Sequence, residues 1–289
     1  MTRDIQNTER EPTQAHNFGR REVLGLLGAT AAASLVGGRG AESASAQTQN
    51  ANSRIVRIDA KPETIAIDTS KTAVIVVDMQ NDFGSKGGML DLAGVDISGI
   101  RKAIAPIAKV LASARHAGIK IVYLKMAFRP DLSDFGASDS PNRLKHPPFV
   151  GKITPAPDGR ESRILIRDTW NTDIVDELKP QADDLAIYKH RFSGFYQTDL
   201  DATLRKLGIQ YLIIAGCTTS VCVEATVRDA MYRDYSCVLL EDCMSQPTPP
   251  HGVPGSNHDA SLVLAEAYFG WVSKSEQFMT AVQPQAVAP

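Results

Sequence analysis

The fold of this chain is decided by the stretch Gly216-Cys217-Thr218-Thr219-Ser220-Val221-Cys222-Val223-Glu224-Ala225-Thr226. The apolar run 211–215 before it has the length of a buried strand, and residues 223–231 have the pattern of a helix. This order places Cys222 at the N-terminal end of a helix, just beyond the carboxyl edge of a sheet. Backbone N–H groups there favour a thiolate and can hold an oxyanion. Cys222 is therefore a candidate nucleophile, with a small core residue as the alternative.

Two other predicted strands also end in a charged residue. Residues 73–77 precede Asp78, and residues 184–188 precede Lys189. Taken singly, Asp78 has the alternative role of capping a turn or helix, and Lys189 that of a solvated surface residue. Open α/β sheets bind ligands at the carboxyl ends of their strands, so we expect Asp78, Lys189 and Cys222 to meet there. Lys189 would lower the pKa of the thiol, and Asp78 would carry its proton.

These segments resemble the motifs of the isochorismatase-like cysteine hydrolases, which include nicotinamidases, carbamoylsarcosine amidases, biuret hydrolases and ureidoacrylate amidohydrolases. The matching residues are Val77 to Phe83, Lys189, and Gly216 to Val223, and the resemblance extends over roughly residues 61–278. It implies a single doubly wound, Rossmann-like α/β domain with a mainly parallel six-stranded sheet. It also implies a catalytic triad of Asp78, Lys189 and Cys222, a cis peptide between Cys217 and Thr218, and an oxyanion hole made by the amides of Thr218 and Cys222.

Within that family the chain most resembles ureidoacrylate amidohydrolases, in residues 87–94, 175–178, 191–195 and 269–273. This resemblance implies substrate contacts by Asp134 and Ser140. Three positions depart from it, because Met126, Phe128 and Phe192 stand where that group has an asparagine, a tryptophan and a tyrosine. Residues 129–132 instead resemble biuret hydrolases. Phe83, Phe128, Phe192 and Phe195 are expected to form the apolar walls of the pocket, with core packing as the alternative.

The expected function is cysteine-dependent cleavage of a C–N bond in a small ureido, carbamoyl or carboxamide substrate, through a thioester acyl-enzyme. The presence of Cys222 favours amide cleavage over the vinyl-ether hydrolysis of isochorismatases proper. A biuret-type or carbamoylsarcosine-type amidohydrolase is an alternative, as is a non-catalytic periplasmic protein that binds a small amide. A thiol redox protein is disfavoured because the four cysteines show no C-x-x-C spacing. We expect no structural disulfide, while pairing of Cys217 with Cys222 stays open.

The composition and the histidines limit the partners. The chain has 31 basic and 33 acidic residues and a net charge of −2, which does not suggest a nucleic-acid partner, or a membrane partner for the mature form. Residues 125–134 lack the Asp-x-His pair of the nicotinamidase metal site, and the remaining histidines have no ligand spacing, so we predict no metal and no cofactor. His146, His190 and His251 are expected to be polar loop residues, and His258 is a weak candidate for the cleft. By resemblance alone, a homo-oligomer is expected.

The N-terminal residues predict a different kind of segment. Arg20-Arg21 precede a weakly apolar run that reaches Val36, and Ala44-Ser45-Ala46 offers a cleavage site. Residues 1–46 therefore resemble a twin-arginine signal for export to the periplasm. The alternative is a tail with an accidental arginine pair, which leaves the protein in the cytoplasm. We predict a linker over 47–60, the hydrolase domain over 61–280 and a tail over 281–289, with the long loops 127–163 and 246–256 covering the pocket.

Overall fold

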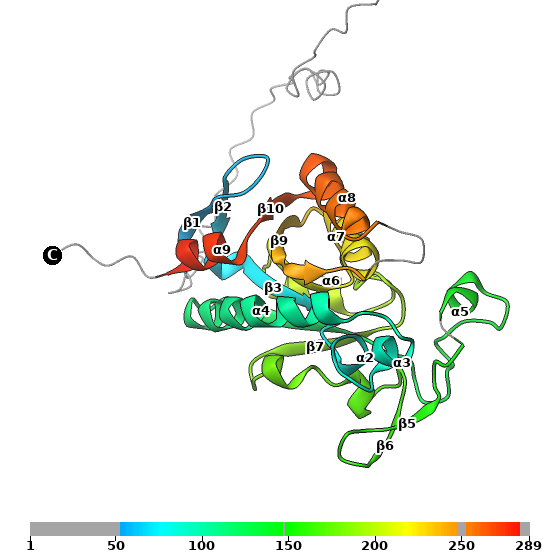
Figure 1. The fold of residues 1–289 in the computed structure, drawn as a ribbon. Coiled ribbons are helices and arrows are strands. Elements are labelled where there is room, and N and C mark those ends of the chain that lie inside the picture. The colour runs from blue at the N-terminus through cyan, green and yellow to red at the C-terminus, as the bar shows by residue number, and fades with distance from the viewer. Residues whose placement is uncertain (1–52, 147, 248–252, 284–289) are drawn as a thin grey trace, which may run out of the picture. The chain divides into compact units, whose positions relative to one another are not determined.

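The computed structural model describes residues 53–146, 148–247 and 253–283, which belong to one compact unit, 49–289. The predicted signal over 1–46 lies outside the described residues. The central sheet has six strands, all parallel, in the order β10-β9-β8-β3-β4-β7 (Figure 1). Its strands are β3 (Thr72–Val77), β4 (Lys120–Met126), β7 (Leu185–Lys189), β8 (Tyr211–Cys217), β9 (Ser236–Ser245) and β10 (Trp271–Ser273). The predicted doubly wound α/β fold is confirmed.

Helices cover both faces of this sheet. On one face, α4 (Ser98–His116) and α9 (Ser275–Val282) pack against alternate strand residues such as Val74, Val76 and Tyr123. On the other face, α6 (Leu200–Lys206) and α7 (Glu224–Met231) pack against the intervening residues, among them Ile75 and Leu124. All six residues of β3 are buried, because this strand lies in the middle of the sheet and is covered on both sides.

Short elements complete the unit. Helices α2 (Asn81–Gly84) and α3 (Met89–Leu92) follow β3, and α8 (Ser256–Leu264) continues into a π-helical turn at Ala265–Phe269. One-turn 3-10 helices lie at Thr69–Lys71, Trp170–Thr172 and Asp176–Leu178. Among the described residues, no helix is both long enough and apolar enough to cross a lipid bilayer.

Two predicted boundaries are wrong. Residues 47–60 were expected to be a linker, but β1 (Ile55–Ile58) lies within them and pairs antiparallel with β2 (Ile65–Asp68). Val56 and Ile58 are buried and alternate with exposed residues along the strand. Packing of these two side chains into the core stabilises β1. The domain therefore begins before residue 61. At the other end, α9 continues to Val282, beyond the predicted end at 280.

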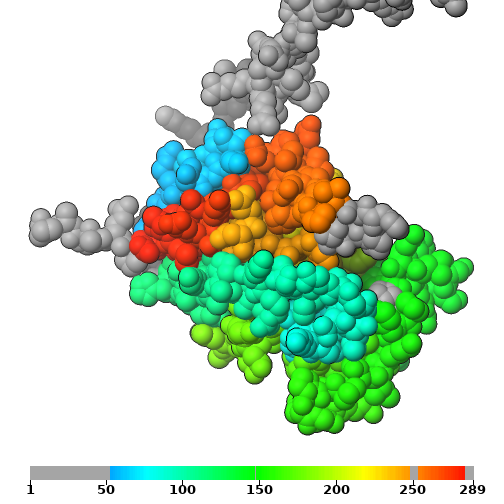
Figure 2. Space-filling model, viewed as in Figure 1, coloured from blue at the N-terminus to red at the C-terminus, as the bar shows by residue number. Residues whose placement is uncertain are grey.

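The long segment 127–163 has structure of its own. It contains α5 (Pro141–Lys145) and a two-stranded antiparallel sheet of β5 (Ile153–Pro155) and β6 (Glu161–Arg163). Figure 2 shows these residues, in green, as a protrusion at the end of the domain away from β1 and α9. Phe128, at its start, and Phe135 are buried, so the segment is anchored to the domain by aromatic side chains.

Candidate active site

Parallel pairing brings Asp78, Lys189 and Cys222 to one edge of the sheet. Asp78 follows the last residue of β3, Lys189 is the last residue of β7, and Cys222 lies in a π-helical turn, Thr219–Val223, that leads from β8 into α7. The register aligns Val77 with Gly216 of β8 and aligns Met126 of β4 with Lys189. The predicted meeting of the three side chains is therefore what this topology produces.

Asp78 and Lys189 form a fully buried ion pair. Lys189 Nζ lies 2.8 Å from Asp78 Oδ2, and neither side chain has any exposed surface. The other carboxylate oxygen, Oδ1, accepts a hydrogen bond from the Met126 amide at 2.9 Å. Lys189 also donates to the Arg191 carbonyl at 3.3 Å and contacts Met126 Sδ at 3.7 Å. These contacts hold the two charged groups in fixed positions beside the thiol.

The backbone at Asp78 is unusual for a residue with a side chain. Its φ is +50°, in the left-handed region that aspartate tolerates better than most residues. Its amide still donates to Leu124 O at 2.9 Å, so the bend begins directly after the last pairing of β3 with β4. Non-glycine residues in this region are concentrated at functional sites, which agrees with the place of Asp78 in this one.

Burial sets the protonation states of the three groups. It raises the pKa of Asp78, although the Lys189 ammonium opposes the shift. Burial alone would lower the pKa of Lys189, but the negative charges of Asp78 and Cys222 outweigh it and raise that pKa, so Lys189 stays charged. Burial raises the pKa of the Cys222 thiol to about 12; the nearby Lys189 ammonium opposes this shift, and the nearby Asp78 carboxylate adds to it.

Burial therefore outweighs the lowering of the Cys222 thiol pKa that was expected from Lys189. The sequence indicated a helix terminus and a nearby lysine, both of which favour a thiolate, but not the loss of solvent around the sulfur. A thiol with a pKa of about 12 is protonated at neutral pH. It needs a base in contact with it at the moment of attack. Asp78, whose pKa is raised, is placed to be that base.

The segment before Cys222 has an irregular backbone. The peptide between Cys217 and Thr218 is cis, as the resemblance implied. The Thr218 amide has no hydrogen-bond acceptor among residues 53–146, 148–247 and 253–283. Gly216 has a φ of +119°, and a Cβ there would lie 2.1 Å from the Val77 carbonyl oxygen. Only glycine allows β8 to approach β3 this closely at the site.

Side chains from α8 and from the segment after β9 hold the turn that carries Cys222. Thr219 Oγ1 and His258 Nδ1 lie 2.9 Å apart, and the Ser220 amide donates to Gln246 Oε1 at 2.9 Å. His258, a weak candidate from sequence, thus contacts the turn through Thr219. Cys217 is buried, and its thiol donates to the Asp78 carbonyl at 3.2 Å. The cysteines at 217, 222, 237 and 243 are all free thiols in this structure.

Three of the six predicted substrate-binding residues lie beside the triad. Met126 contacts the Lys189 ammonium, and Phe128 and Phe192 each pack against the ring of His146. Phe128 is fully buried, whereas Phe192 is 39% exposed and so is accessible to a ligand. Phe128, expected in the pocket wall, is therefore a core residue, whereas Phe192 presents apolar surface on this side of the site.

The other three have structural roles. Phe83 is buried in the core cluster on the α4 side of the sheet. Asp134 accepts from the Arg129 amide at 2.9 Å and from the Arg167 side chain at 2.8 Å, so both of its oxygens are occupied. Ser140 caps α5 by accepting from the Arg143 amide. Phe195, expected in the pocket wall, is likewise a buried core residue.

Two residues near the site were not singled out from the sequence. Gln80 is buried and connects β3 to β4, because its side chain accepts from the Met126 amide at 2.7 Å and donates to the Met126 carbonyl at 3.0 Å. His146 was expected to be a polar loop residue, but it packs within an aromatic cluster and is close enough to Lys189 for that charge to lower its pKa. Nothing in the local sequence around His146 indicates these contacts.

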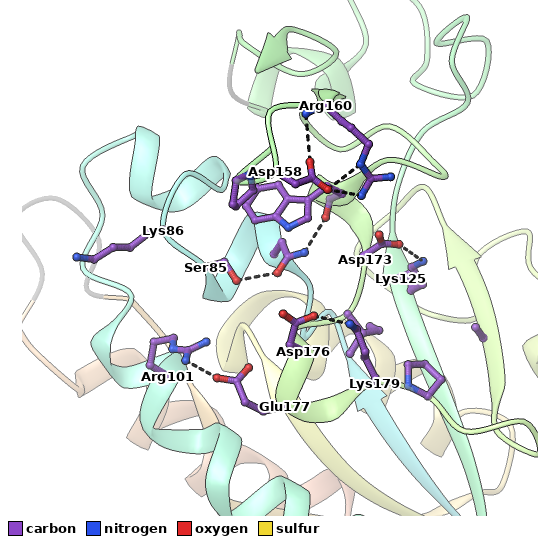
Figure 3. Close-up of a pocket in the computed structure, with 16 residues that line it drawn as sticks. Ser85, Lys86, Arg101, Lys125, Asp158, Arg160, Asp173, Asp176, Glu177 and Lys179 are labelled. Atoms are coloured by element: carbon purple, nitrogen blue, oxygen red, sulfur yellow. Dashed lines mark hydrogen bonds and ion pairs between the residues drawn. The ribbon is translucent and has the colours of Figure 1, made fainter. Parts of the chain in front are cut away.

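A separate cavity of about 800 Å³ lies near α2, α4 and β7 (Figure 3). Its wall includes Lys125, which precedes Met126 in β4 and therefore points to the opposite face of the sheet. None of the triad residues lines it. Charged side chains of its wall pair with one another, as in Arg101 with Glu177 and Lys179 with Asp176. Among the described residues, no group of three histidine, cysteine or acidic side chains could hold a metal ion.

Comparison with known proteins agrees with this geometry. The family model of the isochorismatase domain matches residues 72–277. The ureidoacrylate amidohydrolase RutB of Yersinia enterocolitica is 40% identical over 238 residues, which cover 79% of this chain and 96% of that protein. The RutB of Rhizobium rhizogenes is 38% identical over 240 residues, covering 83% and 95%.

Solved structures place the chain in the same group. A cysteine hydrolase from Pseudomonas syringae pv. phaseolicola superposes with a TM-score of 0.63 at 30% identity, over 79% of this chain and 97% of that one. The N-carbamoylsarcosine amidase of Thermoplasma acidophilum gives a TM-score of 0.53 at 26% identity, over 71% and 97%. The chain therefore belongs to the isochorismatase family and is one of its hydrolases.

Proposed function

We propose that this protein is a cysteine-dependent amidohydrolase that cleaves the C–N bond of a small ureido, carbamoyl or carboxamide substrate through a thioester acyl-enzyme. One observation carries the proposal: a fully buried Asp78–Lys189 ion pair of 2.8 Å whose two charged groups lie close enough to Cys222 to shift the pKa of its thiol. A thiol, a carboxylate base and a fixed cation held close together are the components of nucleophilic attack on an amide.

The first half of the reaction forms the acyl-enzyme. Asp78 takes the proton of the Cys222 thiol as the sulfur attacks the substrate carbonyl carbon, and Lys189 stabilises the negative charges. The backbone N–H groups of Thr218 and Cys222 hold the resulting oxyanion, and one such donor contributes about 3–4 kcal/mol to catalysis. Protonated Asp78 then passes its proton to the leaving nitrogen. The C–N bond breaks, and the acyl group remains on sulfur.

The second half restores the enzyme. A water molecule attacks the thioester carbonyl while Asp78 accepts its proton, and the same backbone amides hold the second oxyanion. The C–S bond breaks, and Asp78 returns the proton to the Cys222 sulfur. The raised pKa of Asp78 suits a group that accepts and donates a proton twice in each cycle.

Ureidoacrylate is the first substrate to test, because the two RutB proteins named above are ureidoacrylate amidohydrolases and are about 40% identical to this chain. A carbamoylsarcosine-type substrate is the second candidate, supported by the likeness to the Thermoplasma acidophilum amidase. Biuret is the third, because residues 129–132 resemble biuret hydrolases. These substrates share a planar carbonyl bonded to nitrogen, which is the group that the triad attacks.

The test is ammonia release by the purified full chain with ureidoacrylate, biuret, N-carbamoylsarcosine, nicotinamide and acetamide. Cys222→Ala removes the nucleophile, and Cys237→Ala is the matched control because Cys237 is also a buried thiol but lies in β9. We expect turnover of at least one substrate by the wild type and the control, and none by Cys222→Ala. Equal turnover by Cys222→Ala would refute the proposal, and so would no turnover of any of the five by the wild type.

A further inference from the structure

His146 is held in one tautomer by its own segment. It follows α5, and its Nδ1 lies 2.6 Å from the Asn142 carbonyl oxygen. A carbonyl oxygen only accepts hydrogen bonds, so Nδ1 carries the proton. Burial and the positive charges of Lys189 and Arg191 lower the pKa of His146, so the ring is neutral at pH 7 and its Nε2 is an acceptor. In the part of the chain that the structure describes, no donor is bonded to Nε2.

The ring lies within an aromatic cluster formed by Phe128, Phe135, His146 and Phe192. The ring of His146 stacks on that of Phe192, with 5.4 Å between ring centroids and 21° between planes. It lies edge-to-face with the rings of Phe128 and Phe135, with 5.5 and 5.4 Å between centroids. Phe128 and Phe135 lie 4.3 Å apart. Stacked and edge-to-face rings at these separations attract one another and hold His146 in place.

This cluster adjoins the triad. Phe128 comes two residues after Met126, which touches the Lys189 ammonium, and the amide of Ala127 between them donates to Lys189 O at 2.9 Å. Phe192 follows Arg191, whose carbonyl also receives a hydrogen bond from Lys189. The partly exposed ring of Phe192 and the His146 ring stacked on it therefore lie on the Lys189 side of the site, close enough for the Lys189 charge to act on His146.

We propose that His146 binds the substrate: its Nε2 accepts a hydrogen bond from a substrate N–H, and its ring, with Phe192, selects substrates with a flat, conjugated group next to the reacting carbonyl. This inference rests on the proposed function in one respect, because the proposed function places the substrate carbonyl group at Cys222. A flat group gains by stacking on aromatic faces, whereas a puckered group of equal size does not fit against them as closely.

The test is binding rather than turnover, measured by NMR titration of the full chain carrying Cys222→Ala. The probes are benzamide, which is flat and conjugated, and cyclohexanecarboxamide, which has a puckered ring of similar size. His146→Phe keeps an aromatic ring but removes the acceptor, whereas His146→Gln keeps an acceptor oxygen. His116→Phe is the matched control, because His116 is exposed at the end of α4.

We expect benzamide to bind at least about threefold more tightly than cyclohexanecarboxamide. His146→Phe is expected to weaken benzamide binding about tenfold, the effect of one lost hydrogen bond, while His146→Gln recovers most of it and His116→Phe changes nothing. Equal binding by His146→Phe would overturn the inference, as would no preference for the flat probe or no binding of either probe. If these binding results hold but the wild type hydrolyses no amide, the proposed function fails and the binding role of His146 stands.

Discussion

Replacing Lys189 by methionine removes the cation from a fully buried ion pair while nearly preserving the length of the side chain. With 2.8 Å between Nζ and Oδ2, the attraction is about 6 kcal/mol at an effective dielectric constant of about 20. Much of this is offset by the desolvation of both ions. Removing one partner nevertheless leaves Asp78 as an uncompensated buried charge, so Lys189→Met should lower the free energy of unfolding by about 3–5 kcal/mol at pH 8.

The loss of stability caused by Lys189→Met should depend on pH in a defined direction. Without Lys189, burial keeps the pKa of Asp78 above its unfolded value of 3.8. A group with a raised folded-state pKa contributes stability that is fully present below the unfolded pKa and is lost as the pH rises through the folded one. The destabilisation by Lys189→Met should therefore be smaller at pH 5 than at pH 8, because the carboxyl group can take up a proton.

Urea denaturation of four proteins completes this test: the wild type, Asp78→Asn, Lys189→Met and the double variant. Each single variant leaves one buried group unpaired, whereas the double variant leaves no buried charge. The double variant should therefore be more stable than the sum of the two single losses predicts, by at least about 1 kcal/mol. Additive losses, or a loss below about 1 kcal/mol for Lys189→Met, would refute the argument that the ion pair is buried and coupled.

Three further predictions concern other parts of the chain. Burial raises the pKa of Asp82 to about 6, so this group contributes about 3 kcal/mol of stability that is present below pH 4 and lost as the pH rises through 6. Asp82→Asn should flatten that part of the stability profile, measured by urea denaturation from pH 4 to 7, and an unchanged slope would contradict this. Gly216→Ala should lower the free energy of unfolding by more than about 3 kcal/mol, because the new Cβ would clash with the Val77 carbonyl oxygen. Gly94→Ala, at a residue that also has a positive φ but has open space around it, should lower it by only about 1–2 kcal/mol. Equal losses for the two variants would contradict the close approach of β8 to β3 at Gly216. Lysines in place of Arg20 and Arg21 should retain the protein in the cytoplasm of a host with twin-arginine export, as followed by cell fractionation, whereas unchanged fractionation would refute the signal.

The central strands were predictable because their signal is local. Residues 73–77 and 211–215 are continuous apolar runs, which is typical of strands covered on both faces, and each is followed by a residue of the site. β1 was missed although Ile55 to Ile58 alternate in burial, because a run of four residues beside a polar segment is too short to separate from a linker. The length of β9 has no such local signal, because its last five residues include Glu241 and Asp242, yet its pairing with β8 continues to Ser245.

The site was predictable in its residues but not in its electrostatics. Strand order alone places Asp78, Lys189 and Cys222 at one edge, but the pKa of Cys222 depends on how completely the surrounding segments exclude water. His146 is a similar case. Its contacts join residues 128, 135 and 192, which are brought together by the packing of a long segment rather than by any periodic pattern near position 146.

The proposed mechanism requires a covalent bond between the sulfur of Cys222 and the acyl part of the substrate. To detect this bond, the full chain is mixed with the substrate that releases ammonia fastest, quenched in acid within one turnover, and mapped by peptide mass spectrometry. We expect an acyl group at Cys222, on the peptide that contains this residue, and no adduct in Cys222→Ala. Turnover with an adduct on another residue, or full activity in Cys222→Ala, would show that Cys222 is not the nucleophile.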